Sequence, residues 1–251
     1  TDKNKEYVAV MLLGKVTDTQ DTTGTVLEEH PVEVTEEQVK EAVLSFTGEY
    51  MQIPPMYSAL KVNGKKLCDL ARAGVTVERQ ARPVQLYSIE IIKMELPRVC
   101  MRVRCSKGTY IRTLCQDIGE KLSCGACMES LLRTKVSEFC VQDALRLSEI
   151  EERVQKAAGQ TQSEQWNAEM FDFIYAVDSV FLQYKKAVIC KEWNKLLYNG
   201  NRMKKDMFVS YQKDWEQQKV RIYDEEGRFI GIYEYSEIHG DYKPVKLFME
   251  A

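Results

Sequence analysis

The sequence of 251 residues predicts an α+β fold that is followed by a small β-barrel. Three observations predict it. Residues 35–46 and 111–122 repeat apolar residues at the helical spacing of three and four. Residues 96–105 alternate apolar and basic side chains with a period of two, as a half-buried strand does. Beyond residue 178 the pattern changes to short strands joined by turns.

The first predicted strand is residues 7–13, an unbroken apolar run that we expect to be covered on both faces. A polar turn at 17–24 follows. The helix at 35–46 begins with a capping box, in which Thr35 and Gln38 satisfy each other's backbone N–H groups.

Residues 67–74 are predicted to form a short helix that closes at a glycine. The segments 84–96 and 98–105 have the pattern of neighbouring strands, and the turn at 106–109 leads into the helix at 111–122.

The C-terminal half contains a further helix at 148–159, for which Ser148 and Glu151 predict another capping box. Residues 160–168 are polar and typical of a linker. Two apolar runs within 219–235, joined by a glycine-containing turn, predict a hairpin of the small barrel.

The charge of the chain is unevenly distributed. The net charge of −3 taken alone argues against a nucleic-acid partner. Residues 57–136, however, hold fifteen Lys and Arg against seven Asp and Glu, while residues 1–56 hold four against eleven. This basic segment is what a polyanion-binding face requires.

Eight cysteines raise the question of disulfides or a metal site. Cys124 and Cys127 have ligand-like spacing, but zinc needs a second pair, and none of the other cysteines supplies one. We therefore expect no metal, no cofactor and free thiols. With no apolar run long enough for a membrane and no signal-peptide pattern, the expected compartment is the cytoplasm.

Residues 105–119 are the strongest candidate for a site. The turn at 106–109 delivers Tyr110 and Arg112 to the first turn of a helix, where backbone N–H groups are unsatisfied and anions are favoured. An ordinary strand-to-helix connection with solvated charges would explain this segment equally well on its own.

A second segment, together with the first, resembles a known family. Pro-Pro-Met-Tyr-Ser-Ala-Leu-Lys-x-x-Gly-Lys-Lys-Leu at 54–67, Cys-Ser-Lys-Gly-Thr-Tyr-Ile-Arg-Thr at 105–113 and Asp-Ile-Gly-Glu-Lys-Leu at 117–122 closely resemble the bacterial tRNA pseudouridine-55 synthases, the TruB family. Lys-Glu-Tyr at 5–7 and the turn at 14–24 fit the same pattern. The resemblance runs from about residue 3 to residue 147.

The resemblance implies a mixed, largely antiparallel sheet flanked by helices, and a PUA-like RNA-binding barrel. It implies a catalytic domain at 1–158, a linker at 159–177 and the PUA-like domain at 178–251. The implied activity is isomerisation of uridine 55 in the T loop of tRNA by base flipping. The implied partner is tRNA, bound by a monomer without a cofactor.

The resemblance also assigns roles to residues. Tyr7 stacks on the flipped base, Tyr110 contacts it, and Leu131 lines the pocket. Arg112 pairs with the catalytic aspartate, which a guanidinium keeps ionised and oriented. The candidates for phosphate contacts are Lys61, Lys65, Lys66, Arg72, Lys107 and Arg133.

One departure concerns the catalytic aspartate itself. In the family it lies in a Gly-x-Leu-Asp-Pro motif, and no Asp-Pro dipeptide occurs in this sequence, which starts at Thr1. We expect the chain to be a fragment of a longer polypeptide rather than a relative without its nucleophile. Arg112 is then solvated or pairs elsewhere. Asp18 and Asp21 are weak substitutes, because aspartate is common in such Thr/Gly-rich turns.

Three functions therefore remain open. The first is an RNA-modifying isomerase. The second is a non-catalytic RNA-binding or tRNA-folding protein, which would keep the basic face and the stacking residues. The third is a thiol or zinc enzyme that uses Cys124 and Cys127, which metal analysis would reveal.

Overall fold

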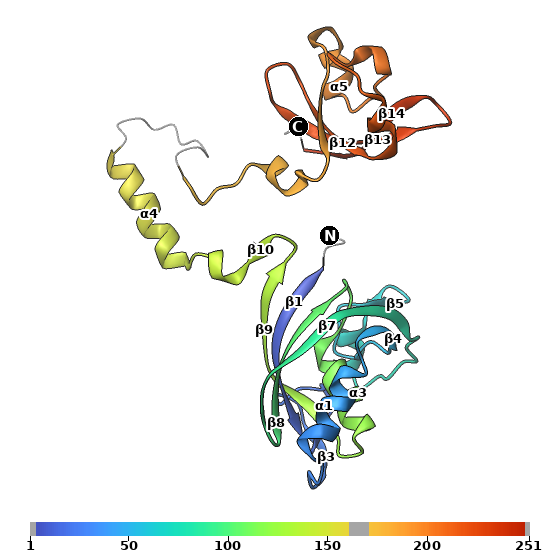
Figure 1. Cartoon of the computed structure of the whole chain (residues 1–251), viewed down its shortest axis with the longest axis vertical. Coiled ribbons are helices and arrows are strands. Elements are labelled where there is room, and N and C mark those ends of the chain that lie inside the picture. The colour runs from blue at the N-terminus through green and yellow to red at the C-terminus, as the bar shows by residue number, and fades with distance from the viewer. Residues whose placement is uncertain (1–3, 161–170, 249–251) are drawn as a thin grey trace. The chain divides into compact units, whose positions relative to one another are not determined.

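The computed structural model describes residues 4–160 and 171–248, which fall into two compact units, Thr1–Ala144 and Leu145–Ala251, each with its own hydrophobic core (Figure 1). The helix α4 (Leu147–Gln160) belongs to the second unit. The linker predicted at 159–177 lies partly outside the described residues.

The first unit is built on one six-stranded sheet in which all neighbouring strands are antiparallel, as expected. Its strands, in spatial order, are β10 (Phe139–Cys140), β9 (Ala126–Val136), β1 (Lys5–Leu13), β8 (Arg98–Cys105), β7 (Arg82–Glu95) and β4 (Gly48–Gln52). The predicted neighbours at 84–96 and 98–105 are β7 and β8.

Two helices, α1 (Glu36–Leu44) and α3 (Ile111–Lys121), lie against one face of this sheet (Figure 1). The capping box of α1 is present as predicted: Thr35 accepts the N–H of Gln38, and Gln38 accepts that of Thr35. The remaining elements of this unit are short: β2 (Lys15–Thr17), β3 (Val26–Glu29), β5 (Lys61–Val62), β6 (Lys65–Lys66) and α2 (Leu67–Arg72).

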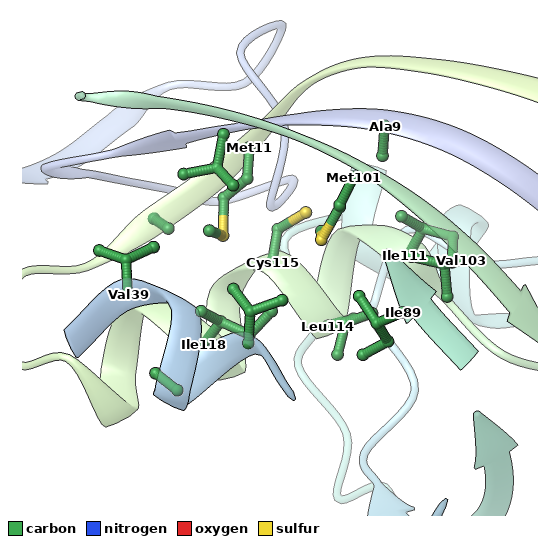
Figure 2. Close-up of a cluster of buried hydrophobic side chains, with 14 of the residues drawn as sticks. Ala9, Met11, Val39, Ile89, Met101, Val103, Ile111, Leu114, Cys115 and Ile118 are labelled. Atoms are coloured by element: carbon green, nitrogen blue, oxygen red, sulfur yellow. The ribbon is translucent and has the colours of Figure 1, made fainter. Parts of the chain in front are cut away.

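The core of the first unit lies between α3 and the sheet. Figure 2 shows Leu114 and Ile118 of α3 on the same side of the sheet as Met11 and Met101, and all four side chains are fully buried. Complete burial of such a side chain contributes about 1.5–3 kcal/mol. The apolar stripe predicted for residues 111–122 therefore fixes α3 against the sheet.

The C-terminal end of α3 touches the next strand through backbone atoms. A Cβ added to Gly119 would lie 2.2 Å from the amide nitrogen of Ala126, the first residue of β9. The carbonyl of Gly119 accepts the N–H of Gly125 at 3.0 Å. A side chain at position 119 is therefore excluded, and the helix and strand pack directly on each other.

The expectation that residues 7–13 are covered on both faces is wrong for the first half of β1. Its inward residues Ala9 and Met11 are buried, whereas Val8 and Val10 are half-buried on the opposite face. The cross-strand neighbours of Val8 are Arg102 and Leu132, and side chains of this size cover the valine in place of a second layer of helices.

The second unit contains a four-stranded sheet of β11 (Lys185–Val188), β12 (Lys219–Tyr223), β13 (Phe229–Ser236) and β14 (Asp241–Leu247). The predicted hairpin is confirmed as β12 and β13. The predicted barrel is not: within the described residues the sheet is open, and its edges are β11 and β14. The helix α5 (Asn194–Tyr198) and three short 3₁₀ turns, Lys191–Trp193, Lys205–Met207 and Lys213–Gln217, lie between β11 and β12 in the chain, and a further 3₁₀ turn, Val177–Phe181, precedes β11.

The start of α4 also differs from the prediction. The helix begins at Leu147, so Ser148 is already helical, and the carboxylate of Glu149 accepts the N–H of Arg146 at 2.7 Å. The capping box of Ser148 and Glu151 is therefore wrong by one to two residues. No helix in the described ranges is long and apolar enough to span a bilayer.

Candidate functional site

Arg112 lies in the first turn of α3 and binds three acceptors from two loops. Its Nη1 donates to Asp21 Oδ2 at 3.0 Å and to the carbonyl oxygen of Thr19 at 3.2 Å. Its Nη2 donates to the carbonyl oxygen of Tyr57 at 2.8 Å. We call these four residues the Arg112 site. The guanidinium fork thus joins the turn at 17–24 to the loop at 53–60.

The Asp21 carboxylate is charged and closely bound. Its Oδ1 accepts the Thr19 hydroxyl at 2.8 Å and the Thr23 N–H at 3.1 Å. Burial raises the pKa of Asp21, but hydrogen bonds from Thr23, Thr19 and Arg112 outweigh burial, so its pKa lies below the usual range. The side chains of Arg112 and Asp21 are 23% and 15% exposed, so the pair is largely shielded from water.

The turn that carries Asp21 is anchored to strand β9. Asp21 forms a β-bridge with Met128, the N–H of Thr22 donates to the Met128 carbonyl, and the N–H of Met128 donates to the Gln20 carbonyl. The side chain of Gln20 in turn accepts the Thr113 hydroxyl at 2.7 Å. A polar turn is thereby held firmly enough to present a carboxylate to α3.

Tyr110 is the N-cap residue of α3, with extended backbone angles and no side-chain capping bond. The side chain of Gln52, at the end of β4, holds its backbone on both sides. Gln52 Oε1 accepts the Tyr110 N–H at 2.8 Å, and Gln52 Nε2 donates to the Tyr110 carbonyl oxygen at 3.0 Å. Tyr110 itself is half-buried.

Tyr7 and Leu131 lie on the same face of the sheet, on adjacent strands. Tyr7 is opposite Arg133 in the β1–β9 register, and Leu131 is opposite Ala9. Leu131 is 43% exposed, as a pocket wall can be. Tyr7 is 7% exposed, and the Arg133 guanidinium lies 5.5 Å from its ring centre, so any ligand reaches this ring beside a cation.

The basic candidates are exposed, as phosphate contacts must be. Lys61, Lys65 and Lys66 lie in or beside the β5–β6 hairpin, Arg72 ends α2, and Lys107 lies in the turn before α3. A cavity of about 290 Å³ opens beside the hairpin; it is lined by Pro54, Leu60, Lys61, Val62, Leu67, Glu78, Arg79, Gln80 and Arg82. Three cations and one acidic residue line it, so it suits an anionic group.

Sequence reasoning gave Arg112 two outcomes in this chain, solvation or pairing elsewhere, and did not identify Asp21 as its partner. The two residues are 91 positions apart, and the turn pattern at 17–24 accounts for Asp21 without reference to Arg112. Gln52 was missed for the same reason. In the described residues no group of three or more His, Cys, Asp or Glu side chains could hold a metal ion, and the eight cysteines are free thiols.

Two family models match consecutive parts of the chain. The one described as "TruB family pseudouridylate synthase (N terminal domain)" matches residues 1–111. The one described as "tRNA pseudouridylate synthase B C-terminal domain" matches residues 112–182. The join between the two matches falls at the beginning of α3, beside Arg112.

Relatives of known name cover nearly the whole chain. It is 48% identical over 260 residues to the tRNA pseudouridine synthase B of Lachnoclostridium phytofermentans, covering 99% of this chain and 81% of that protein. With the protein of the same name from Clostridium kluyveri the identity is 37%, covering 99% and 79%.

A solved structure has the same fold. It is described as a Cbf5-Nop10-Gar1 complex, and its matching chain superimposes with a TM-score of 0.64 at 22% identity, covering 99% of this chain and 66% of that one. This likeness concerns the fold alone, whereas the family models and the relatives agree on one family throughout. The chain belongs to the TruB family of pseudouridylate synthases.

Proposed function

We propose that this protein acts on the T stem-loop of tRNA and isomerises uridine 55 to pseudouridine. The relatives are named tRNA pseudouridine synthase B. Uridine 55 is the target that the resemblance of the sequence motifs implies. The observation that carries the proposal is the Arg112 site, in which a largely shielded guanidinium is fixed next to Tyr110 at the start of α3.

The reaction breaks a glycosidic C–N bond, turns the base and forms a C–C bond, with no redox change and no net water. It therefore needs an extruded base, a surface on which the base stacks, and a carboxylate in a dry pocket. Flipping a uridine out of a folded loop costs a few kcal/mol. Stacking on an aromatic side chain recovers about 1–3 kcal/mol per base, and we assign this role to Tyr110 and Tyr7.

The exposed cations support binding of an RNA backbone. Lys61, Lys65 and Lys66 are close together in sequence and structure, and the cavity lined by Lys61, Arg79 and Arg82 lies beside them. Such contacts position a nucleic acid without reading its sequence. Recognition would then come from the shape of the T loop and its splayed bases.

The catalytic carboxylate is the finer part of the proposal. We propose that the reaction uses an aspartate of the Gly-x-Leu-Asp-Pro type, which these 251 residues do not contain, and that Arg112 is its counter-ion. Asp21 is a poor substitute. Its Oδ1 already accepts bonds from Thr19 and Thr23, and its Oδ2 accepts Arg112, so few lone pairs are left for attack on a sugar carbon.

The test is to incubate the chain with uridine-containing T-loop RNA and to measure pseudouridine by mass spectrometry after derivatisation. We expect binding without turnover, and turnover when a Gly-x-Leu-Asp-Pro segment is supplied in cis. If both forms bind RNA and neither reacts, the alternative of a non-catalytic tRNA-binding protein is correct. Turnover by the chain alone would transfer the catalytic role to Asp18 or Asp21.

A further inference from the structure

Gln52 is a buried polar residue whose hydrogen bonds go mainly to a distant part of the chain. It is 1% exposed, at the last position of β4, where the strand leaves the sheet. Its bonds to Tyr110 span 58 residues. Burying an amide is unfavourable unless its hydrogen bonds are made, so the sequence keeps a glutamine here for those bonds.

The two bonds define one orientation of the amide. The oxygen must accept, because it faces the N–H of Tyr110, and the nitrogen must donate, because it faces the carbonyl of Tyr110. Gln52 Nε2 also donates to the hydroxyl of Tyr50. The Gln52 amide thus bonds both the N–H and the carbonyl of Tyr110, as a residue of a neighbouring β-strand would.

Tyr110 needs such support because the segment before it is a tight turn. Gly108 has a φ of +88°, which a residue with a side chain adopts poorly, and the added Cβ would meet nothing within 4 Å. The space at the Cβ position of that glycine is therefore open, and its conformation is the reason for a glycine there. On the other side of Tyr110, Ile111 is buried and Arg112 is bound at its site. Between the turn and the helix, the backbone of Tyr110 is held by its two hydrogen bonds to Gln52.

The same strand is tied to α3 a second time. The hydroxyl of Tyr50 interacts electrostatically with the carboxyl of Asp117, seven residues further along the helix, which corresponds to about 10 Å of rise. Burial, followed by the negative charge of Asp117, raises the pKa of Tyr50, so its hydroxyl stays neutral and can donate. Two separated attachments fix both the position and the angle of α3 relative to β4.

From this geometry we propose that Gln52 is a positioning residue for the reaction. By holding the N–H and the carbonyl of Tyr110, it sets the direction in which the Tyr110 ring meets the flipped uracil, and it does so without touching the RNA. At 1% exposure it cannot contact a ligand directly. The proposal rests on the proposed function, since it assumes that Tyr110 contacts the base.

The principal variant is Gln52→Met, which keeps the length of the side chain and removes its hydrogen bonds. Base extrusion is measured by the fluorescence of pyrrolocytidine placed at the target position of a T stem-loop RNA, and affinity is measured on the same RNA. We expect the equilibrium constant for extrusion to fall about tenfold, as expected for two lost hydrogen bonds, while affinity changes less than about threefold. Equal extrusion by parent and variant would refute the proposal.

Gln52→Glu tests the donor to the Tyr110 carbonyl and is the harsher change, because it buries a carboxylate at a position that is 1% exposed. It keeps an oxygen for the Tyr110 N–H but sets an oxygen instead of a donor against the Tyr110 carbonyl, so we expect extrusion no higher than that of Gln52→Met. The matched control is Gln38→Met. Gln38 also accepts a backbone N–H, but at the exposed start of α1, so this variant lowers the melting temperature without changing extrusion.

A measurement without RNA separates this proposal from the proposed function. Amide hydrogen exchange at Tyr110 should be about tenfold faster in Gln52→Met than in the parent, with little change at Ile118, which lies two turns into α3 and does not bond to Tyr110 as the Leu114 N–H does. If exchange responds but the parent chain does not extrude the base, the function is wrong and the structural link stands. If exchange at Tyr110 is unchanged, Gln52 does not position it.

Discussion

Arg112 and Asp21 form an ion pair, with 3.0 Å between Nη1 and Oδ2, although 91 positions separate them in the chain. The same guanidinium also binds the carbonyl oxygens of Thr19 and Tyr57. One arginine therefore holds together the start of α3, the Asp21 turn and the loop that contains Tyr57.

Arg112→Lys tests how much the hydrogen bonds of the planar guanidinium contribute to stability beyond its charge. A lysine ammonium keeps the charge but cannot reach three acceptors spread over two loops, so one carbonyl is left without its donor. We expect a loss of about 1–3 kcal/mol in the free energy of unfolding, measured by urea denaturation. The control is Arg102→Lys, because Arg102 pairs with Glu90 on the exposed face and should lose less than about 1 kcal/mol. Equal losses of unfolding free energy in the two variants would show that the hydrogen bonds of the Arg112 guanidinium add no stability beyond its charge.

Asp117 gives the protein a pH-dependent stability. Burial, and then the charge of Glu120, raises the pKa of Asp117 to about 6 in the folded state. The folded chain therefore holds this proton more tightly than the unfolded chain does. The stabilisation from this carboxyl is complete below about pH 4 and is lost as the pH rises to about 6.

Asp117→Asn should remove the loss of stability that the buried Asp117 carboxyl causes as the pH rises. After allowance for solvent screening of a partly exposed group, we expect a gain on the order of 1 kcal/mol at pH 7.5, or about 2–4 °C in melting temperature. The gain should shrink steadily toward pH 4 in thermal denaturation monitored by circular dichroism. A gain that is independent of pH would mean that the carboxyl of Asp117 titrates in the usual range.

The lysines of the β5–β6 hairpin should govern the salt dependence of RNA binding. Lys65→Ala together with Lys66→Ala removes two exposed cations, so the slope of log affinity against log salt should flatten by about 0.7–0.9 for each phosphate that the protein no longer neutralises. Lys15→Ala with Lys40→Ala removes the same charge from the acidic first 56 residues and should leave the slope unchanged. If the two pairs behave alike, the basic segment is not the RNA footprint.

Tyr110→Ala should impair base extrusion more than RNA affinity, because we assign the contacts with the RNA backbone to other residues. The loss of stacking predicts a fall of about 1–3 kcal/mol in extrusion, measured with a fluorescent base analogue. Tyr87→Ala is the control, since Tyr87 is 45% exposed on β7. Tyr7→Ala should also reduce extrusion, but it removes a buried ring and so lowers stability as well. Normal extrusion by both Tyr7→Ala and Tyr110→Ala would exclude them as the stacking surface.

The elements that could be predicted from sequence are those in which the buried residues recur at one regular spacing, either that of a helix or that of a strand. The stripe of Ile111, Leu114 and Ile118 predicts α3, and the alternation of Val99, Met101 and Val103 predicts β8, because each set faces one core. The open sheet of the second unit could not be predicted, since closure of a barrel depends on pairing between edge strands and not on the pattern within any strand.

The candidate site was predicted in part. Tyr110 and Arg112 stand out because a turn, a cation and an aromatic residue occur together in the sequence. Asp21 and Gln52 do not stand out, because each is ordinary in its own segment and gains its role through a hydrogen bond to a residue far along the chain. Such tertiary hydrogen bonds have no sequence period, so only the folded structure reveals them.

At Gly119 the end of α3 packs directly on Ala126, the first residue of β9. Leu131 lies five residues beyond Ala126, about 17 Å along the strand at 3.4 Å per residue. A methyl group at position 119 would meet the backbones of Gly125 and Ala126, so α3 and the first residue of β9 would have to move apart, and this would strain the β1–β9 ladder that places Leu131 and Arg133 beside Tyr7. The close packing of α3 at the beginning of this ladder thus depends on the absence of one side chain.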